Sequence, residues 1–156
     1  KKMRFMRWMR IGLVLTFSSL ASCRHNTVPI DYENDSCAYC RMMITDKRFG
    51  AELITKKGKI YKFDSIECLT AHVAQKTEDA SAIETLWTID FTRPGEWVHC
   101  EDAAYLHSRN LPSPMGAFLS SFQNKAELSA VKLKYDGENL DWSQVQILVK
   151  NEWLKN

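Results

Sequence analysis

The sequence predicts an α+β domain built from two small strand–helix units that pack as one compact region, after an N-terminal signal and a flexible tether. Two observations predict this class. Short segments rich in β-branched and aromatic residues alternate with helix-like segments, and turns containing Gly or Pro separate them. The 134 residues that follow residue 22 are enough for one compact domain. We therefore divide the chain into a signal (1–22), a tether (23–36) and a folded domain (37–150).

Residues 1–22 have the features of a secretion signal. A basic stretch without acidic residues comes first, and the apolar run over 11–20 is too short for a membrane span, which needs about 20 residues. The Leu-Ala-Ser-Cys sequence ending at Cys23 resembles the lipobox that the lipoprotein signal peptidase reads. We expect cleavage before Cys23, lipidation of Cys23 and a membrane-anchored lipoprotein on the periplasmic or extracytoplasmic side. An ordinary signal with a chance Cys, or a short transmembrane anchor, are the alternatives.

Charge excludes one class of partner. The whole chain has 21 basic and 19 acidic residues, but the signal holds five of the basic ones. The remaining 16 basic and 19 acidic residues give a net charge near −3. A basic stripe is absent, so we do not expect a nucleic-acid partner. Residues 23–36 are mostly polar and include one Pro, which is typical of a flexible tether.

The first half of the domain predicts a hairpin followed by a helix. Apolar and β-branched residues at 52–55 and 60–63 flank a turn that contains Gly. The Asp64–Ser65 pair is suited to cap a helix over 66–76, and Glu67 lies three residues after Asp64, as in a capping box.

The second half predicts shorter elements. The type of the segment 117–122 is left open. The expected elements are strands at 86–91 and 97–100, a helical turn at 102–106, a Pro-rich loop at 108–116, a short helix opening at 124–128, a strand at 132–135, and a helix over 141–149 capped by Asp141.

A sulfur-rich segment directly follows the tether. Cys37, Cys40, Met42 and Met43 fall within seven residues, before the first expected strand. Thiolate and thioether groups are soft donors, and soft donors select Cu(I) over hard cations. The one other Met of the mature chain, Met115, lies in the Pro-rich loop, where its side chain can be directed at a site.

The Cys-x-x-Cys spacing alone leaves several interpretations open. Cys37 and Cys40 could form a structural disulfide in an exported protein or a redox dithiol, although no strand precedes them as it does in thioredoxin-type enzymes. A zinc site would need a second closely spaced pair of ligands, which is missing. Haem attachment is excluded because Arg41, not His, follows Cys40.

Four motifs follow one another along the chain: Cys37-x-x-Cys40-x-Met42, Phe49-Gly50-Ala51-Glu52, Lys57-Gly58-Lys59-x-Tyr61-x-Phe63-Asp64 and Pro114-Met115-Gly116. In this order they resemble the NosL family, copper-binding lipoproteins associated with maturation of nitrous oxide reductase. The resemblance implies an α+β fold of two similar units, Cu(I) as the bound metal, and copper delivery to an apo-enzyme. The family often has Gly where this chain has Arg41, and Cys37 is an additional upstream cysteine.

The resemblance also implies a ligand set. Cys40 matches the thiolate of the Cys-x-Met element, Met42 its thioether, and Met115 the downstream Met-Gly element. Cys37 is a fourth candidate, and Met43 is interpreted as a packing residue.

Other candidates receive structural interpretations. Tyr61, Phe63 and Asp64 are expected to form a strand end and a helix cap. Cys68 and His72 would share one helix face, where we favour a buried thiol and a hydrogen-bonded histidine over contact with copper. His99 and His107 are similarly remote candidates for contact with copper, and the role of Cys100 is left open.

The function we expect is that of a membrane-anchored Cu(I) metallochaperone, not an enzyme, with nitrous oxide reductase as the recipient. The mature chain has no paired carboxylates in an acid/base motif, no nucleophile elbow and no phosphate-binding Gly loop. Two alternatives remain: a thiol-disulfide oxidoreductase using Cys37 and Cys40, and a structural lipoprotein with a stapling disulfide.

Overall fold

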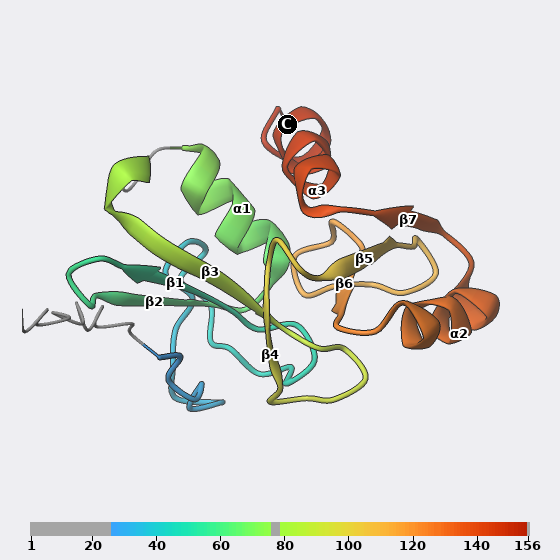
Figure 1. The fold of residues 1–156 in the computed structure, drawn as a ribbon, viewed down its shortest axis with the longest axis horizontal. Helices are drawn as coiled ribbons and strands as arrows, with labels where there is room; N and C mark the ends of the chain where they lie inside the picture. Colours follow the sequence, from blue (N-terminus) through green and yellow to red (C-terminus); the bar gives the residue numbers. More distant parts are fainter. Residues whose placement is uncertain (1–25, 76–78, 156) are drawn as a thin grey trace, which may run out of the picture.

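The computed structural model describes residues 26–75 and 79–155, and its chain forms two antiparallel sheets that lie side by side (Figure 1). The predicted signal and Cys23 lie outside the described residues. The α+β class is confirmed, with three α-helices in the described part of the chain. Within the same ranges, no helix has the length and apolar character that a membrane crossing requires.

The first sheet has the order β2-β1-β3-β4. Its strands are β1 (Ala51–Thr55), β2 (Ile60–Phe63), β3 (Ile83–Ile89) and β4 (Trp97–His99). The predicted hairpin is present as β1 and β2, and every residue of β1 is buried because two strands flank it and α1 packs against it. Helix α1 (Ile66–Ala74) follows β2 directly, and a short 3-10 turn (Ala80–Ala82) leads into β3.

The second sheet has the order β6-β5-β7 and carries two helices. Helix α3 passes into a π-helical turn, η2, that packs against α1 of the first unit. The elements are β5 (Ala104–His107), β6 (Leu119–Phe122), α2 (Lys125–Tyr135), β7 (Glu138–Leu140), α3 (Trp142–Leu148) and η2 (Val149–Trp153).

One hydrophobic core joins the two units. Leu53 from the first sheet, Leu69 from α1, Tyr105 from the second sheet and Val145 from α3 belong to the same cluster of buried side chains. Each of these four side chains is completely buried. A shared core fixes α1 between the two sheets, and α1 carries part of the site described below.

Two sequence predictions in the second unit are wrong. The expected helical turn at 102–106 is strand β5 over most of its length, because the ladders to β6 and β7 and the burial of Tyr105 and Leu106 outweigh local propensity. The expected strand at 132–135 is the last turn of α2.

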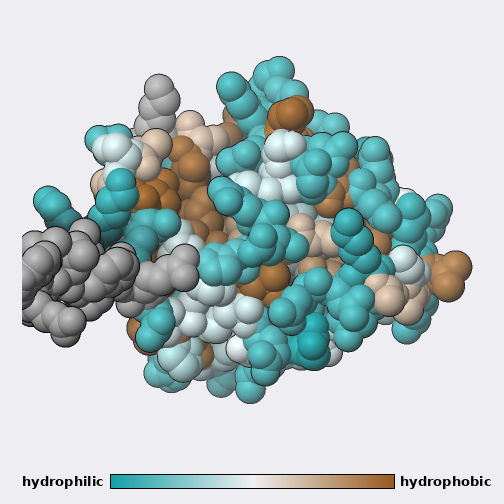
Figure 2. Space-filling view, in the orientation of Figure 1, coloured by the Kyte–Doolittle hydropathy of each residue, from teal (hydrophilic) through white to brown (hydrophobic). Residues whose placement is uncertain are grey.

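The pattern in α2 explains the second error. One face of α2, with Leu128, Val131 and Tyr135 at helical spacing, packs in a second, smaller hydrophobic cluster that includes Leu106. Leu133 points outward and is 91% exposed. Hydrophobic atoms project at the α2 end of the molecule in Figure 2. A single exposed Leu between lysines imitates the alternation of a strand.

Helix capping is as expected in one case and different in the other. Asp141 forms the predicted cap of α3, with a complete capping box to Gln144. At α1 the N-cap is Ser65, whose hydroxyl accepts from the Cys68 N–H. Glu67 does not close a capping box; its side chain crosses to Ser113 instead.

The described part of the expected tether packs against the first sheet. The Val28 N–H donates to the Glu52 carboxylate at 3.2 Å, and Ile30 is only 7% exposed. Gly50 makes room for Ile30, since a side chain at Gly50 would collide with it. From Val28 onward the chain is therefore held by the domain.

Candidate metal centre

The segment carrying Cys37 and Cys40 is a tight loop closed by its own backbone. The Cys37 N–H donates to the Met42 carbonyl at 2.8 Å, and the Arg41 N–H donates to the Cys37 carbonyl at 3.0 Å. A bridge between Ser36 and Met43 closes the base of the loop. These bonds make the loop compact enough for both thiols to turn toward the same space.

The loop is fixed to the end of the β1–β2 hairpin. The Ala38 N–H donates to the Lys62 carbonyl at 2.8 Å, and the Lys62 ammonium pairs with Asp35 at 2.6 Å. β2 ends one residue before Asp64, and α1 begins at Ile66, so Cys68 lies in the first turn of the helix. The hairpin and the helix start thus bring Asp64 and Cys68 to the loop.

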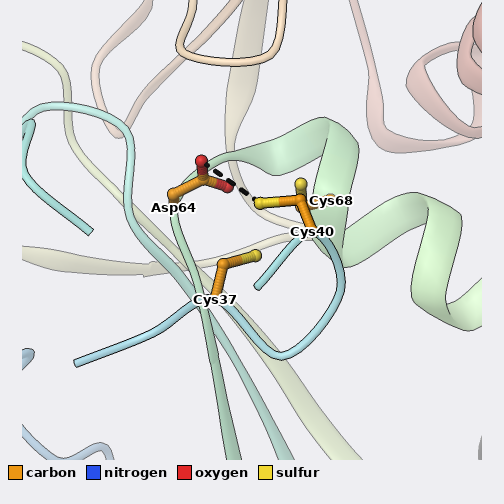
Figure 3. A group of neighbouring side chains, drawn as sticks. All are labelled: Cys37, Cys40, Asp64 and Cys68. Atoms are coloured by element: carbon orange, nitrogen blue, oxygen red, sulfur yellow. Dashed lines mark hydrogen bonds between the residues drawn. The ribbon is translucent and has the colours of Figure 1, made fainter. Parts of the chain in front are cut away.

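Four side chains converge on one point (Figure 3). The Sγ atoms of Cys37, Cys40 and Cys68 and a carboxylate oxygen of Asp64 all lie within 4.8 Å of one another. Cys37 and Cys68 are completely buried and Cys40 is half-buried. The Cys40 thiol donates a hydrogen bond to Asp64 Oδ2 at 3.7 Å.

The electrostatics of the cluster differ from thiol to thiol. A hydrogen bond from Cys68 lowers the pKa of Cys37, and backbone N–H groups of Tyr39, Cys40 and Asp64 act in the same direction. The same hydrogen bond with Cys37, together with burial, raises the pKa of Cys68. Burial raises the pKa of Cys40. The cluster therefore holds one cysteine that favours the thiolate form, Cys37, beside two that favour the protonated thiol, Cys40 and Cys68.

The two methionines of the sulfur segment lie at the surface. Met42 is 53% exposed and Met43 is 55% exposed, so the interpretation of Met43 as a packing residue is wrong. Both line a cleft together with Asp64, and Pro112, Ser113 and Pro114 of the Pro-rich loop line the same cleft. The cleft thus joins the cysteine loop to the Pro-rich loop.

Met115 comes next in the Pro-rich loop and is half-buried against the main core. Its carbonyl accepts a hydrogen bond from Trp153 Nε1 at 3.2 Å. The Trp153 ring packs on Tyr39 of the cysteine loop, with the ring centroids 5.9 Å apart. Glu67 holds the same loop from the other side: its carboxylate accepts from the Ser113 hydroxyl at 2.5 Å and from the Ala117 N–H at 3.4 Å. Three hydrogen bonds to two distant side chains, Trp153 and Glu67, therefore hold the loop of Met115.

The histidines named from the sequence lie elsewhere. His72 is buried and packs against the rings of Tyr61 and Phe63. His99 stacks on Trp87 at 3.5 Å. Among the described residues, the cluster of candidate metal ligands contains no histidine.

Comparison with known proteins identifies the family. A family model for NosL matches residues 28–149. The chain belongs to the NosL family. Its fold is similar to the crystal structure of the copper chaperone NosL from Shewanella denitrificans, with a TM-score of 0.67 and 19% identity over 77% of this chain and 95% of that one. A search of curated proteins gave no match. NosL is a non-enzymatic family, so the expectation that the chain is not an enzyme is confirmed.

The fold explains one departure from the NosL pattern. Arg41 has a φ of 67°, in the left-handed region that Gly enters without steric cost. A Gly between the Cys and the Met is therefore the residue that this turn geometry favours. Arg41 adopts the same conformation at a cost in backbone strain.

Sequence reasoning missed two members of the cluster. Asp64 was interpreted as a helix cap and Cys68 as a buried core thiol, and both are members of the cluster around Cys37 and Cys40. The signal that could have found them is topological. Strand β2 runs antiparallel to β1, so the end of β2 lies beside the start of β1 and near the cysteine loop that precedes it. Helix α1 begins directly after β2, and its first turn therefore faces Cys40.

Proposed function

We propose that this protein is a Cu(I)-binding metallochaperone that carries copper as cargo to an extracytoplasmic cuproenzyme. One observation carries the proposal: three cysteine thiols and a carboxylate lie within 4.8 Å of one another in a chain of the NosL family. The similar fold of the Shewanella denitrificans copper chaperone supports it.

The donor chemistry favours a soft cation. Three sulfurs and one carboxylate offer a mostly thiolate environment, and thiolates select Cu(I) over hard cations such as Mg²⁺ or Ca²⁺. The complete burial of Cys37 and Cys68 shields the bound ion from water on one side, whereas half-buried Cys40 leaves the other side open. An ion held in this way is protected and still reachable by a partner.

The thiols and the thioethers have different parts in the proposal. Cys40 and Cys37 hold Cu(I), and Met42 and Met115 supply thioethers during loading and release. Met42 is exposed at the cleft, which supports its role in loading and release. The same cleft is lined by Pro112, Ser113 and Pro114, directly before Met115, which supports the same role for Met115. A thioether is neutral and loses no proton on binding, so it exchanges a metal more readily than a thiolate.

The accessibility of the thiols argues against the oxidoreductase alternative. Thiol-disulfide exchange requires one thiolate to attack a disulfide of the substrate, so the attacking sulfur must be reachable. Cys37, whose pKa is the lowered one, is completely buried.

Anaerobic titration with Cu(I) against a chromophoric Cu(I) chelator tests the proposal. We expect one tightly bound Cu(I) per reduced chain and loss of tight binding in Cys40→Ser. Cys100→Ser is the matched control, because Cys100 is a free cysteine outside the cluster. Equal affinity in wild type and Cys40→Ser would refute copper binding at this site.

The membrane anchor forms a second part of the proposal. If Cys23 carries the lipid, five residue steps separate it from Val28, where the chain is clamped to Glu52. Five extended steps span at most about 18 Å, so the domain would stay close to the bilayer surface. Cys23→Ser should release the protein from washed membranes. Quantitative retention of this variant in the membrane fraction would contradict the anchor.

Nitrous oxide reductase is the recipient we propose, on the basis of the NosL family. The test incubates Cu(I)-loaded protein with copper-depleted nitrous oxide reductase and follows the copper content of the enzyme after separation. We expect transfer from wild type and none from Cys40→Ser. Transfer no faster than that from a Cu(I)–glutathione control would argue for another recipient.

A further inference from the structure

We propose that Cys68 is a third thiolate ligand, so that Cys37, Cys40 and Cys68 together form a three-coordinate Cu(I) site. This inference rests on the proposed copper-binding function and extends it to a residue outside the Cys-x-Met motif. It assigns a metal-binding role to a cysteine of helix α1 that local sequence alone does not distinguish from a core residue.

The geometry is close to that of a bound metal. Metal–thiolate bonds are about 2.3 Å long, so three sulfurs around one ion in a trigonal site lie about 4.0 Å apart. The Sγ atoms of Cys37, Cys40 and Cys68 lie within 4.8 Å of one another. A movement of about half an ångström by each sulfur would bring all three onto one ion.

Cys68 lies in the first turn of a helix. Cys68 is the third residue of the nine-residue helix α1, and the positive end of a helix dipole stabilises negative charge there. The Ser65 hydroxyl accepts a hydrogen bond from the Cys68 backbone N–H at 3.3 Å, and the Sγ atoms of Cys68 and Cys37 lie within 4.8 Å of each other. A Cu(I) ion bound by both sulfurs would bring a positive charge that offsets the repulsion between two thiolates.

Cys100 provides the contrast that makes the inference specific. Cys68 and Cys100 are both completely buried free cysteines of the same core cluster. Cys100 lies after β4, and its carbonyl accepts from the Tyr105 hydroxyl. It is not among the residues that converge on Asp64. Burial alone therefore does not account for the position of Cys68.

The differences in burial also give a direction of exchange. Cys37 and Cys68 form the closed base of the site, Cys40 its half-exposed rim, and Met42 the surface beyond it. A sulfur ligand of a partner can approach at Cys40 while the other two thiolates keep hold of the ion. Copper then passes by ligand exchange, with no electron transfer.

The test compares Cys68→Ser with Cys100→Ser by anaerobic competition for Cu(I). Loss of a support residue outside the ligand set typically costs about 10- to 100-fold in metal affinity, so we expect Cys68→Ser to raise the Kd by at least about 100-fold. Cys100→Ser should match wild type. If Cys68→Ser binds like wild type while Cys40→Ser does not, Cys68 is not a ligand and the proposed function stands. If wild type binds no Cu(I), the proposed function fails as well.

A measurement on the wild-type protein covers the case in which Cys68→Ser does not fold. Cysteine alkylation in mild denaturant, with and without Cu(I), is followed site by site by mass spectrometry. Copper should slow the labelling of Cys37, Cys40 and Cys68 more than that of Cys100, whose labelling slows only as far as bound copper stabilises the whole fold. Labelling of Cys68 at the rate of Cys100, with Cys40 protected, would overturn the inference.

Discussion

The cysteine loop and the Pro-rich loop that carries Met115 (the Met115 loop) line the same cleft, but they are attached to the fold in different ways. Backbone hydrogen bonds within residues 36–43 and to the adjacent strand β2 hold the cysteine loop. The Met115 loop also has a backbone turn, from the Gly116 N–H to the Ser113 carbonyl at 3.1 Å, but two side chains distant in sequence, Glu67 of α1 and Trp153 of η2, attach it to the rest of the fold. Backbone contacts therefore attach the first loop, and side-chain contacts attach the second.

The difference suggests a division between holding and exchanging copper. A site that must keep its thiols together benefits from a rigid backbone, and the cysteine loop has one. A group that must approach and leave the metal needs an attachment that can adjust, and side-chain contacts provide it. Variants that weaken one loop at a time separate these two roles.

The largest expected effect is on the Met115 loop. Glu67→Ala removes the acceptor of the Ser113 hydroxyl and the Ala117 N–H, both buried, and each unpaired buried donor costs about 1–3 kcal/mol. We expect a loss of about 3 kcal/mol in the free energy of unfolding, measured by chemical denaturation. Glu67→Gln, which keeps an acceptor oxygen, should lose much less. Equal stabilities of the Ala and Gln variants would contradict the role of these bonds.

The attachment of the segment that precedes the cysteine loop should respond to pH. Burial raises the pKa of Glu52, which clamps Val28, to about 7. Because the folded state favours the protonated acid, its contribution is complete below the ordinary Glu pKa of about 4.3 and is lost as pH rises toward 7. The melting temperature of wild type should fall over this interval, and that of Glu52→Gln should fall less. Identical pH profiles would rule out this role for Glu52.

Met115→Leu tests exchange with little change in packing. A volume-conserving swap in a core usually costs under about 1.5 kcal/mol, so the variant should stay folded. We expect about tenfold weaker retention or slower transfer of Cu(I), which corresponds to about 1.4 kcal/mol. Met43→Leu serves as the control at the same cleft. Unchanged affinity and unchanged transfer rate in Met115→Leu would remove Met115 from the site.

The smallest expected effect is a gain. Arg41 has a positive φ, and a non-Gly residue there costs about 1–2 kcal/mol, partly offset by the greater backbone entropy of Gly in the unfolded chain. Arg41→Gly should therefore stabilise the protein by up to about 1 kcal/mol without changing its copper affinity. A loss of stability would mean that the Arg41 side chain makes a contact worth more than the strain.

The sequence alone predicted the elements whose signals are local. The β1–β2 hairpin, helix α1 and the capping of α3 by Asp141 rest on turn and cap residues within a few positions of one another. Strand β5 was misassigned because its ladders to β6 and β7, not its own propensity, determine its conformation. Local patterns cannot report a partner that lies many residues away.

The same distinction applies to the candidate site. Cys37 and Cys40 were found because their spacing is visible in the sequence. Cys68 joins them across 28 residues only because the hairpin returns to the cysteine loop, and its place on a helix face looks like that of any core thiol. Whether Met115 contacts the metal remains a prediction for the Leu variant to decide.

X-ray absorption spectroscopy of the Cu(I)-loaded wild-type protein at the copper K-edge reports which atoms bind the metal. Binding by Cys37, Cys40 and Cys68 predicts a first shell made only of sulfur, with about three donors at thiolate bond lengths near 2.3 Å. A first shell dominated by nitrogen or oxygen, or one with a single sulfur donor, would contradict copper binding by the cluster of Cys37, Cys40 and Cys68.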